Sequence, residues 1–186
     1  MDTVQFYVNL GFQHVTDFNG LDHLYFIVAL SLPFGLNDWK KLLWWVTLFT
    51  LGHSLSLIGN YYAGYEFSSY WIELFIPITI ALGCLPLLMQ KSLQANKFSS
   101  GLTFFFGLIH GLGFGRFFAM MVDSSAAVSS LFSFALGVEL AQLAIVLAVL
   151  LLNLLWYKNP PYLKLWRLSL GGIIFLLALA MIVERI

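Results

Sequence analysis

Six apolar stretches follow one another along this chain, and most of them are long enough to cross a lipid bilayer, which takes roughly 20 mostly apolar residues. Of the 186 residues, 60% are hydrophobic and 10% are charged, whereas soluble domains are about 45–50% apolar and 25% charged. We therefore predict an all-α polytopic bundle in contact with the lipid bilayer, with one transmembrane domain over residues 1–186. The predicted spans, of which the first is the shortest, are about 20–36, 41–62, 69–90, 101–121, 126–157 and 162–183.

The first 17 residues mix apolar and polar side chains and are too polar to form a span of their own. This pattern predicts a short amphipathic or re-entrant helix over 1–17 that lies in the membrane interface or folds back into it. The segment has no basic residue before its first apolar positions, so we expect no ordinary cleaved signal peptide.

Basic residues are distributed unequally between the two sides of the predicted bundle. Seven of the nine fall in or beside the connections after the first, third and fifth spans, and two, Arg116 and Arg185, fall on the other side. Because cytoplasmic loops carry the excess of Lys and Arg, we expect a bacterial inner-membrane protein with both termini outside the cytoplasm. The formal net charge of zero gives no support for a nucleic-acid partner, and the oligomeric state, a homo-oligomer included, stays open.

Titratable side chains inside a membrane are costly and are therefore functional candidates. All four histidines lie in or next to the predicted spans, and three acids, Asp22, Glu73 and Glu139, join them. Counting residues from the span ends at about 1.5 Å per residue puts the histidines, Asp22 and Glu139 between the outer interface and the midplane. Glu73 is close enough to the outer end for its carboxylate to reach water.

Helical spacing predicts which of these polar groups share a face. In the second span, a polar stripe recurs every three or four residues, and in the fifth span Glu139 and Gln142 are three residues apart. The stripe consists of Thr50, His53, Ser56 and Asn60. Such faces are expected to point into the bundle. Gly107, Gly111 and Gly115 form a second stripe, which predicts close packing of the fourth span against another helix.

Several imidazoles and carboxylates at similar depth favour a divalent transition metal, because neutral imidazole suits ions such as zinc, copper and nickel. The candidate ligands are His14, Asp22, His23, His53, His110 and Glu139. Structural alternatives stay open for each of them: His14 as an interfacial residue with its ring among the headgroups, Asp22 and His23 as a helix start with Asp22 near the N-cap, His53 and His110 as hydrogen-bonding groups between helices, and Glu139 as a protonated carboxyl group paired with Gln142. In the metal interpretation, Asp22 either ligates the ion or orients a ligating histidine. Arg116 reaches the interface or neutralises an acid in the site.

Four blocks of the sequence resemble motifs of the HupE/UreJ family of membrane proteins. The first combines Gly-Phe-Gln-His-Val at 11–15 with Gly-Leu-Asp-His-Leu at 20–24. The second is Phe-Thr-Leu-Gly-His-Ser-Leu-Ser-Leu at 49–57, and the third is Phe-Gly-Leu-Ile-His-Gly-Leu-Gly-Phe at 106–114. The fourth is Leu-Gly-Val-Glu-Leu-Ala-Gln-Leu at 136–143. The resemblance covers most of the chain, in the family's order.

The resemblance implies a small permease that moves nickel or cobalt for hydrogenase and urease maturation. Seven residues separate His14 from Asp22, where the main branch of the family has five. The fourth span keeps one histidine, His110, without the second histidine and the glutamate of that branch. The chain is thus more similar to a divergent second branch of the family, and cobalt, zinc and copper remain alternatives to nickel.

Two further functions stay open. A weaker resemblance to membrane hydrolases of the alkaline ceramidase type implies a metal-activated water held by Asp22, His23, His53 and His110, with Ser54 beside it. The other open function is that of a metal-dependent sensor or a chaperone-like partner of another membrane complex. Transport needs polar groups in the inner half of the bundle, and few are present there: Ser31, Thr47 and Asn153.

Overall fold

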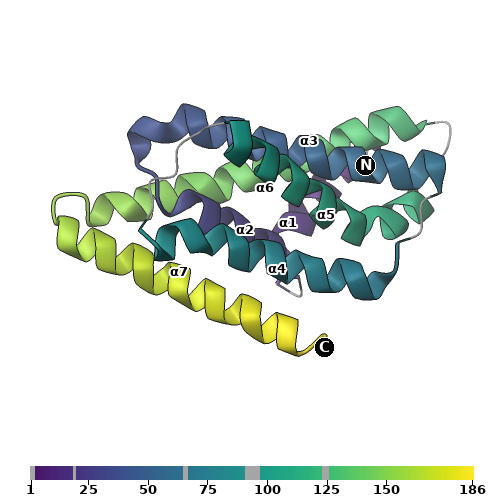
Figure 1. The fold of residues 1–186 in the computed structure, drawn as a ribbon. Helices are drawn as coiled ribbons and strands as arrows, with labels where there is room; N and C mark the ends of the chain where they lie inside the picture. Colours follow the sequence, from purple (N-terminus) through teal and green to yellow (C-terminus); the bar gives the residue numbers. More distant parts are fainter. Residues whose placement is uncertain (1–2, 19, 65–66, 91–96, 123–125) are drawn as a thin grey trace.

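The structure, a computed structural model, describes residues 3–18, 20–64, 67–90, 97–122 and 126–186. Within these ranges it contains helices and no strand, which confirms the all-α prediction (Figure 1). The elements in chain order are α1 (Thr3–Thr16), α2 (Asp22–Ser31), η1 (Leu36–Asp38), α3 (Trp39–Ala63), α4 (Ser69–Leu88), α5 (Lys97–Met121), α6 (Ala127–Leu155) and α7 (Pro160–Val183).

Five of the described helices, α3 to α7, are long and apolar enough to cross a membrane. They match the predicted second to sixth spans to within a few residues at each end. The predicted first span, 20–36, differs, because its helix α2 has only 10 residues. At 1.5 Å per residue α2 is about 15 Å long, half of the roughly 30 Å hydrocarbon core. Alone it cannot complete a crossing.

The crossing is instead shared by α1 and α2, which together lie along α6. The hydroxyl of Tyr7, in α1, donates a hydrogen bond to the carbonyl of Met121, at the end of α5. Beyond the other end of α2, the Asn153 amide near the end of α6 donates to the carbonyls of Leu32 and Phe34. α1 therefore packs on α6, and the first crossing is broken between Thr16 and Asp22.

The two ends of the bundle are called the basic end and the distal end. The basic end is where α3 and α7 begin, and it carries Lys40, Lys41, Lys158 and Lys164. The distal end is where α3 and α5 end and α4 and α6 begin (Figure 1).

Glycines bring α1 and α6 into backbone contact. A Cβ atom on Gly11 would meet the carbonyl oxygen of Phe134, and a Cβ atom on Gly137 would meet that of Val8. Gly11 thus lies opposite Phe134, three residues before Gly137, and Gly137 lies opposite Val8, three residues before Gly11. Because Cα–Cβ bonds tilt toward the helix N-terminus, this reciprocal pattern shows that the two helices run parallel.

The same pattern joins α3 and α5. A Cβ atom on Gly52 would meet the carbonyl oxygen of Phe104, and a Cβ atom on Gly107 would meet that of Phe49. Gly107 belongs to the predicted glycine stripe, and Gly111, one turn later, lies against the carbonyl of His53. The predicted role of the stripe in helix packing is confirmed, with α3 as the partner.

The two parallel pairs run in opposite directions across the bundle. The α1·α6 pair starts at the distal end, and the α3·α5 pair ends there (Figure 1). In both pairs one helix carries Gly-x-x-His, at 11–14 in α1 and at 107–110 in α5. In addition, α4 packs on α7. The segment α1–α4 therefore corresponds to the segment α5–α7 in the opposite orientation across the membrane.

Candidate functional site

All four histidine side chains meet in the interior of the bundle. The ring centroid of His23 lies 4.6 Å from that of His14, 5.4 Å from that of His53 and 5.0 Å from that of His110. His23, His53 and His110 are at most 2% exposed. We call these four residues and Asp22 the imidazole cluster.

The cluster contains two overlapping groups that have the spacing of a metal site. His14, His23 and His53 each offer a ligand atom, and these atoms lie within 4.8 Å of one another. Asp22, His23 and His110 form a second group with the same limit. His23 belongs to both groups, so it is the centre of the cluster.

The break between α1 and α2 positions the first half of the cluster. His14 lies in the last turn of α1, and Asp22 and His23 lie in the first turn of α2. The other half comes from the α3·α5 pair, where Gly111 allows the backbone of α5 to approach the carbonyl of His53. A larger residue at 111 would push His110 and His53 apart, so the glycine contact sets the width of the site.

Asp22 orients His23. The Nδ1 atom of His23 lies 3.2 Å from the Oδ1 atom of Asp22, which also accepts the backbone N–H of His23 at 2.9 Å. When Nδ1 carries the proton, the lone pair is on Nε2, and Nε2 is buried with no hydrogen-bond partner. A carboxylate that fixes the tautomer of a ligating histidine is common beside metals.

Thr79, on α4, fixes the tautomer of His110. The Thr79 hydroxyl donates to the carbonyl of Ile76 at 2.6 Å, and the same oxygen lies 2.9 Å from Nε2 of His110. A hydroxyl has one proton to donate, so Nε2–H of His110 is the donor in the second contact. The Nδ1 lone pair of His110 is therefore free, and this atom is also buried without a partner.

The unpartnered nitrogens are the test of whether a metal fits. Five imidazole nitrogens of the cluster are buried and have no hydrogen-bond partner: His14 Nε2, His23 Nε2, His53 Nδ1 and Nε2, and His110 Nδ1. Buried polar atoms without a partner are costly and rare. A divalent transition ion would satisfy several of them at once, since neutral imidazole nitrogen is its preferred donor. The donor set fits such an ion.

Phenylalanine rings pack against His14 and His110 of the cluster. Phe114 and Phe134 lie against His14, with ring centroids 4.1 and 5.7 Å away, and Phe26 and Phe49 lie 5.3 and 5.2 Å from His110. These apolar rings lower the local polarity, which strengthens electrostatic interactions in the site.

Glu139, a predicted ligand, lies in a separate polar group between α3 and α6. Its Oε1 atom accepts the Thr47 hydroxyl at 2.6 Å, and its Oε2 atom accepts the Thr50 hydroxyl. Gln142 lies beside Thr50 at 3.3 Å. Glu139 belongs to neither three-residue group in the described part of the chain. Since Thr50 is one turn before His53, this group adjoins the cluster on the side of the basic end.

Two further residues adjoin the imidazole cluster. Thr79 was not considered, because nothing in the sequence separates it from other threonines in apolar helices. Glu73, which the sequence places close enough to the outer end for its carboxylate to reach water, is exposed, and it lines a cavity of about 230 Å³ together with Asp22, His23 and His110.

Replacing Thr79 with valine tests the orienting role of its hydroxyl. We expect the affinity for a divalent transition metal to fall about 10–100-fold, as for other partners that orient a ligating histidine. Thr103→Val on α5 is the matched control, because its hydroxyl donates only to the Ser99 carbonyl in its own helix. Titration calorimetry of the purified proteins measures both affinities, and an equal affinity in the Thr79 variant would contradict the tautomer argument.

Comparison with known proteins agrees with this geometry. A family model described as HupE / UreJ protein matches residues 1–185. No curated protein and no solved structure matches the chain. The family match includes every residue of the imidazole cluster and all the helices around it. This integral membrane protein belongs to the HupE/UreJ family.

Proposed function

We propose that the protein is a permease for a divalent transition metal of the nickel or cobalt type, and that the imidazole cluster binds the ion during transport. The observation that carries the proposal is the position of the cluster at a break between two half-helices, α1 and α2. The family is associated with nickel and cobalt transport, and the nitrogen donors suit these ions.

The architecture supports transport over a purely structural metal site. Many secondary transporters consist of repeats of opposite orientation, with a discontinuous helix at a site near the bilayer midplane. Here the α1·α6 and α3·α5 pairs run in opposite directions. His53 is ten residues before the end of α3, and His110 is eleven before the end of α5. At 1.5 Å per residue both lie about 15 Å from the distal end.

Polar groups continue from the cluster toward the basic end, as release of the ion requires. Glu139, with the hydroxyls of Thr47 and Thr50, is one helical turn from His53. We infer that its carboxylate is the next group to meet the ion and compensates its charge. Asn153, farther along α6, is bonded to the carbonyls of Leu32 and Phe34 and belongs to the helix connection.

The membrane orientation is part of the proposal. The described basic residues of the loops gather at one end of the bundle, and this end is cytoplasmic by the rule for Lys and Arg. The distal end would then face the outside of a bacterial inner membrane, with both termini on that side.

Uptake into proteoliposomes tests the proposal. Vesicles with a metal-sensitive dye inside should take up Ni²⁺ or Co²⁺ when they contain the wild-type protein. His53→Ala should lower the rate at least about tenfold, because the group His14–His23–His53 loses one potential ligand and the group Asp22–His23–His110 loses a neighbouring imidazole. Ser54→Ala is the matched control on the same helix and should retain uptake. Equal uptake by His53→Ala and the wild type would contradict the proposal.

The same pair of variants separates the permease from the intramembrane hydrolase that the second resemblance implies. A hydrolase of that type needs both the metal and Ser54, so Ser54→Ala would lose lipid turnover, and vesicles of the wild type would accumulate no metal. The open cavity over Asp22, His23 and His110, about 230 Å³, is the observation that favours this second function.

A further inference from the structure

We propose that Glu73 and Gly113 form the access point through which a divalent cation passes from a vestibule at the distal end to the imidazole cluster. The inference rests on the proposed function and specifies how the ion reaches its site. Neither residue belongs to the three-residue ligand groups.

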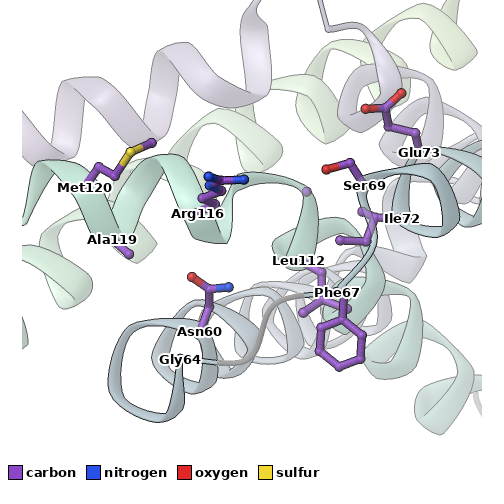
Figure 2. A pocket seen from close by; sticks show the side chains of 11 residues that line it. Asn60, Gly64, Phe67, Ser69, Ile72, Glu73, Leu112, Arg116, Ala119 and Met120 are labelled. Carbon is purple, nitrogen blue, oxygen red and sulfur yellow. The ribbon is translucent and has the colours of Figure 1, made fainter.

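Two cavities meet at these residues. The vestibule, of about 460 Å³, lies between the end of α3, the start of α4 and the end of α5, and Figure 2 shows its lining. The cavity over the cluster, of about 230 Å³, is lined by His14, Asp22, His23 and His110. Glu73 and Gly113 line both cavities, so the two cavities adjoin at these residues.

Gly113 leaves the connection without a side chain. It is exposed although it lies in the middle of a packed helix. A Cβ atom there would lie 3.1 Å from the Cδ1 atom of Ile76 and 3.7 Å from the Cγ2 atom of Ile72. Both neighbours are flexible ends of side chains on α4, so a larger residue would fill the passage without striking backbone.

Glu73 supplies negative charge at the same point. Its side chain is exposed, and Figure 2 shows it on α4 with Ser69, across the vestibule from Arg116 on α5. Pro77 has no N–H, so the backbone carbonyl of Glu73 lacks its usual donor four residues later. Both the carboxylate and this carbonyl are oxygen groups that favour a hydrated divalent cation.

The positive charge of Arg116, in the same vestibule, repels the cation. A cleft lined by one sign of charge raises the association rate of an ion of the opposite sign, by roughly 10–1,000-fold over a whole cleft. Loss of the negative charge at Glu73 and loss of the positive charge at Arg116 must therefore change the association rate in opposite directions. This sign pattern distinguishes steering from general damage to the fold.

The test measures how fast Co²⁺ binds to the purified full-length protein. The visible ligand-field absorption of Co²⁺ follows formation of the nitrogen site after rapid mixing at low ionic strength. We expect Glu73→Gln to slow association about fivefold and Arg116→Gln to accelerate it, with an unchanged stoichiometry in both. Glu184→Gln, which removes an acid at the same end of the bundle outside both cavities, is the control and should leave the rate unchanged.

Gly113→Leu tests the passage itself. Association should slow at least about tenfold at every ionic strength, because the obstruction is steric, while Gly113→Ala should slow it little. The final absorption spectrum should match that of the wild type in each variant. The access proposal is overturned if Glu73→Gln and Gly113→Leu bind Co²⁺ as fast as the wild type, and the proposed function then stands. A wild-type protein that binds no Co²⁺ overturns both.

Discussion

Replacing His23 with alanine is expected to remove tight metal binding altogether, the largest functional effect of any single change in the chain. His23 is shared by the two groups of potential ligands, His14–His23–His53 and Asp22–His23–His110, so neither group keeps three members without it. His14→Ala and His110→Ala each remove one group and leave the other intact. We expect these two variants to bind the metal more weakly but still with measurable affinity.

Metal content after purification and thermal unfolding with added Ni²⁺ or Co²⁺ measure the difference. A ligand at 100 times its dissociation constant stabilises the native state by about 2.7 kcal/mol, which gives a clear upward shift of Tm. The wild type and the His14 and His110 variants should show a shift, and His23→Ala should show none. A metal-dependent shift in His23→Ala equal to that of the wild type would refute the central role of this residue.

Replacing Gly107 with alanine is expected to separate α3 from α5 and to destabilise the protein by about 1–3 kcal/mol, the usual cost of overpacking a well-packed contact. The added methyl group would occupy the position of the Phe49 carbonyl, and backbone cannot move aside as a side chain can. Because these two helices carry His53 and His110 of the imidazole cluster, metal affinity should fall together with stability.

Gly101→Ala is the matched control for this change. Gly101 is on the same helix, and a Cβ atom there meets nothing within 4 Å. It should be neutral or stabilising by up to about 1 kcal/mol, since alanine favours a helix over glycine. Thermal unfolding in detergent compares the two variants. If Gly107→Ala unfolds at the same temperature as Gly101→Ala, the close contact between α3 and α5 does not form as described.

The long helices could be predicted from hydropathy. A membrane-spanning helix forms all its backbone hydrogen bonds internally, and its side chains must be mostly apolar along about 20 residues. The first crossing could not be predicted in this way. α1 carries His14 and Gln13 because its end contributes to the site, so a hydropathy average places it at the surface. Its contact with α6 depends on Gly11 and Gly137, which are 126 positions apart in the sequence.

The proximity of the four histidines could be predicted, but the inner arrangement of the cluster could not. Depth along each helix placed the four histidines at one level, and the ring distances agree with that level. Depth does not say which helices are neighbours. Glu139 has a similar depth to His53, yet it faces Thr47 and Thr50. The role of Thr79 depends on α4 lying beside α5, a pairing that spacing within one helix cannot give.

The inverted repeat divides the ligands unequally between its halves. Three of the four histidines and Asp22 come from the first half, and the second half supplies His110. If the protein descends from two copies of a shorter ancestor that inserted in both directions, the copies have since diverged in their chemistry while keeping their glycine contacts. The scaffold would thus retain its ancestral duplication in the backbone, and most of the imidazole cluster would belong to one copy.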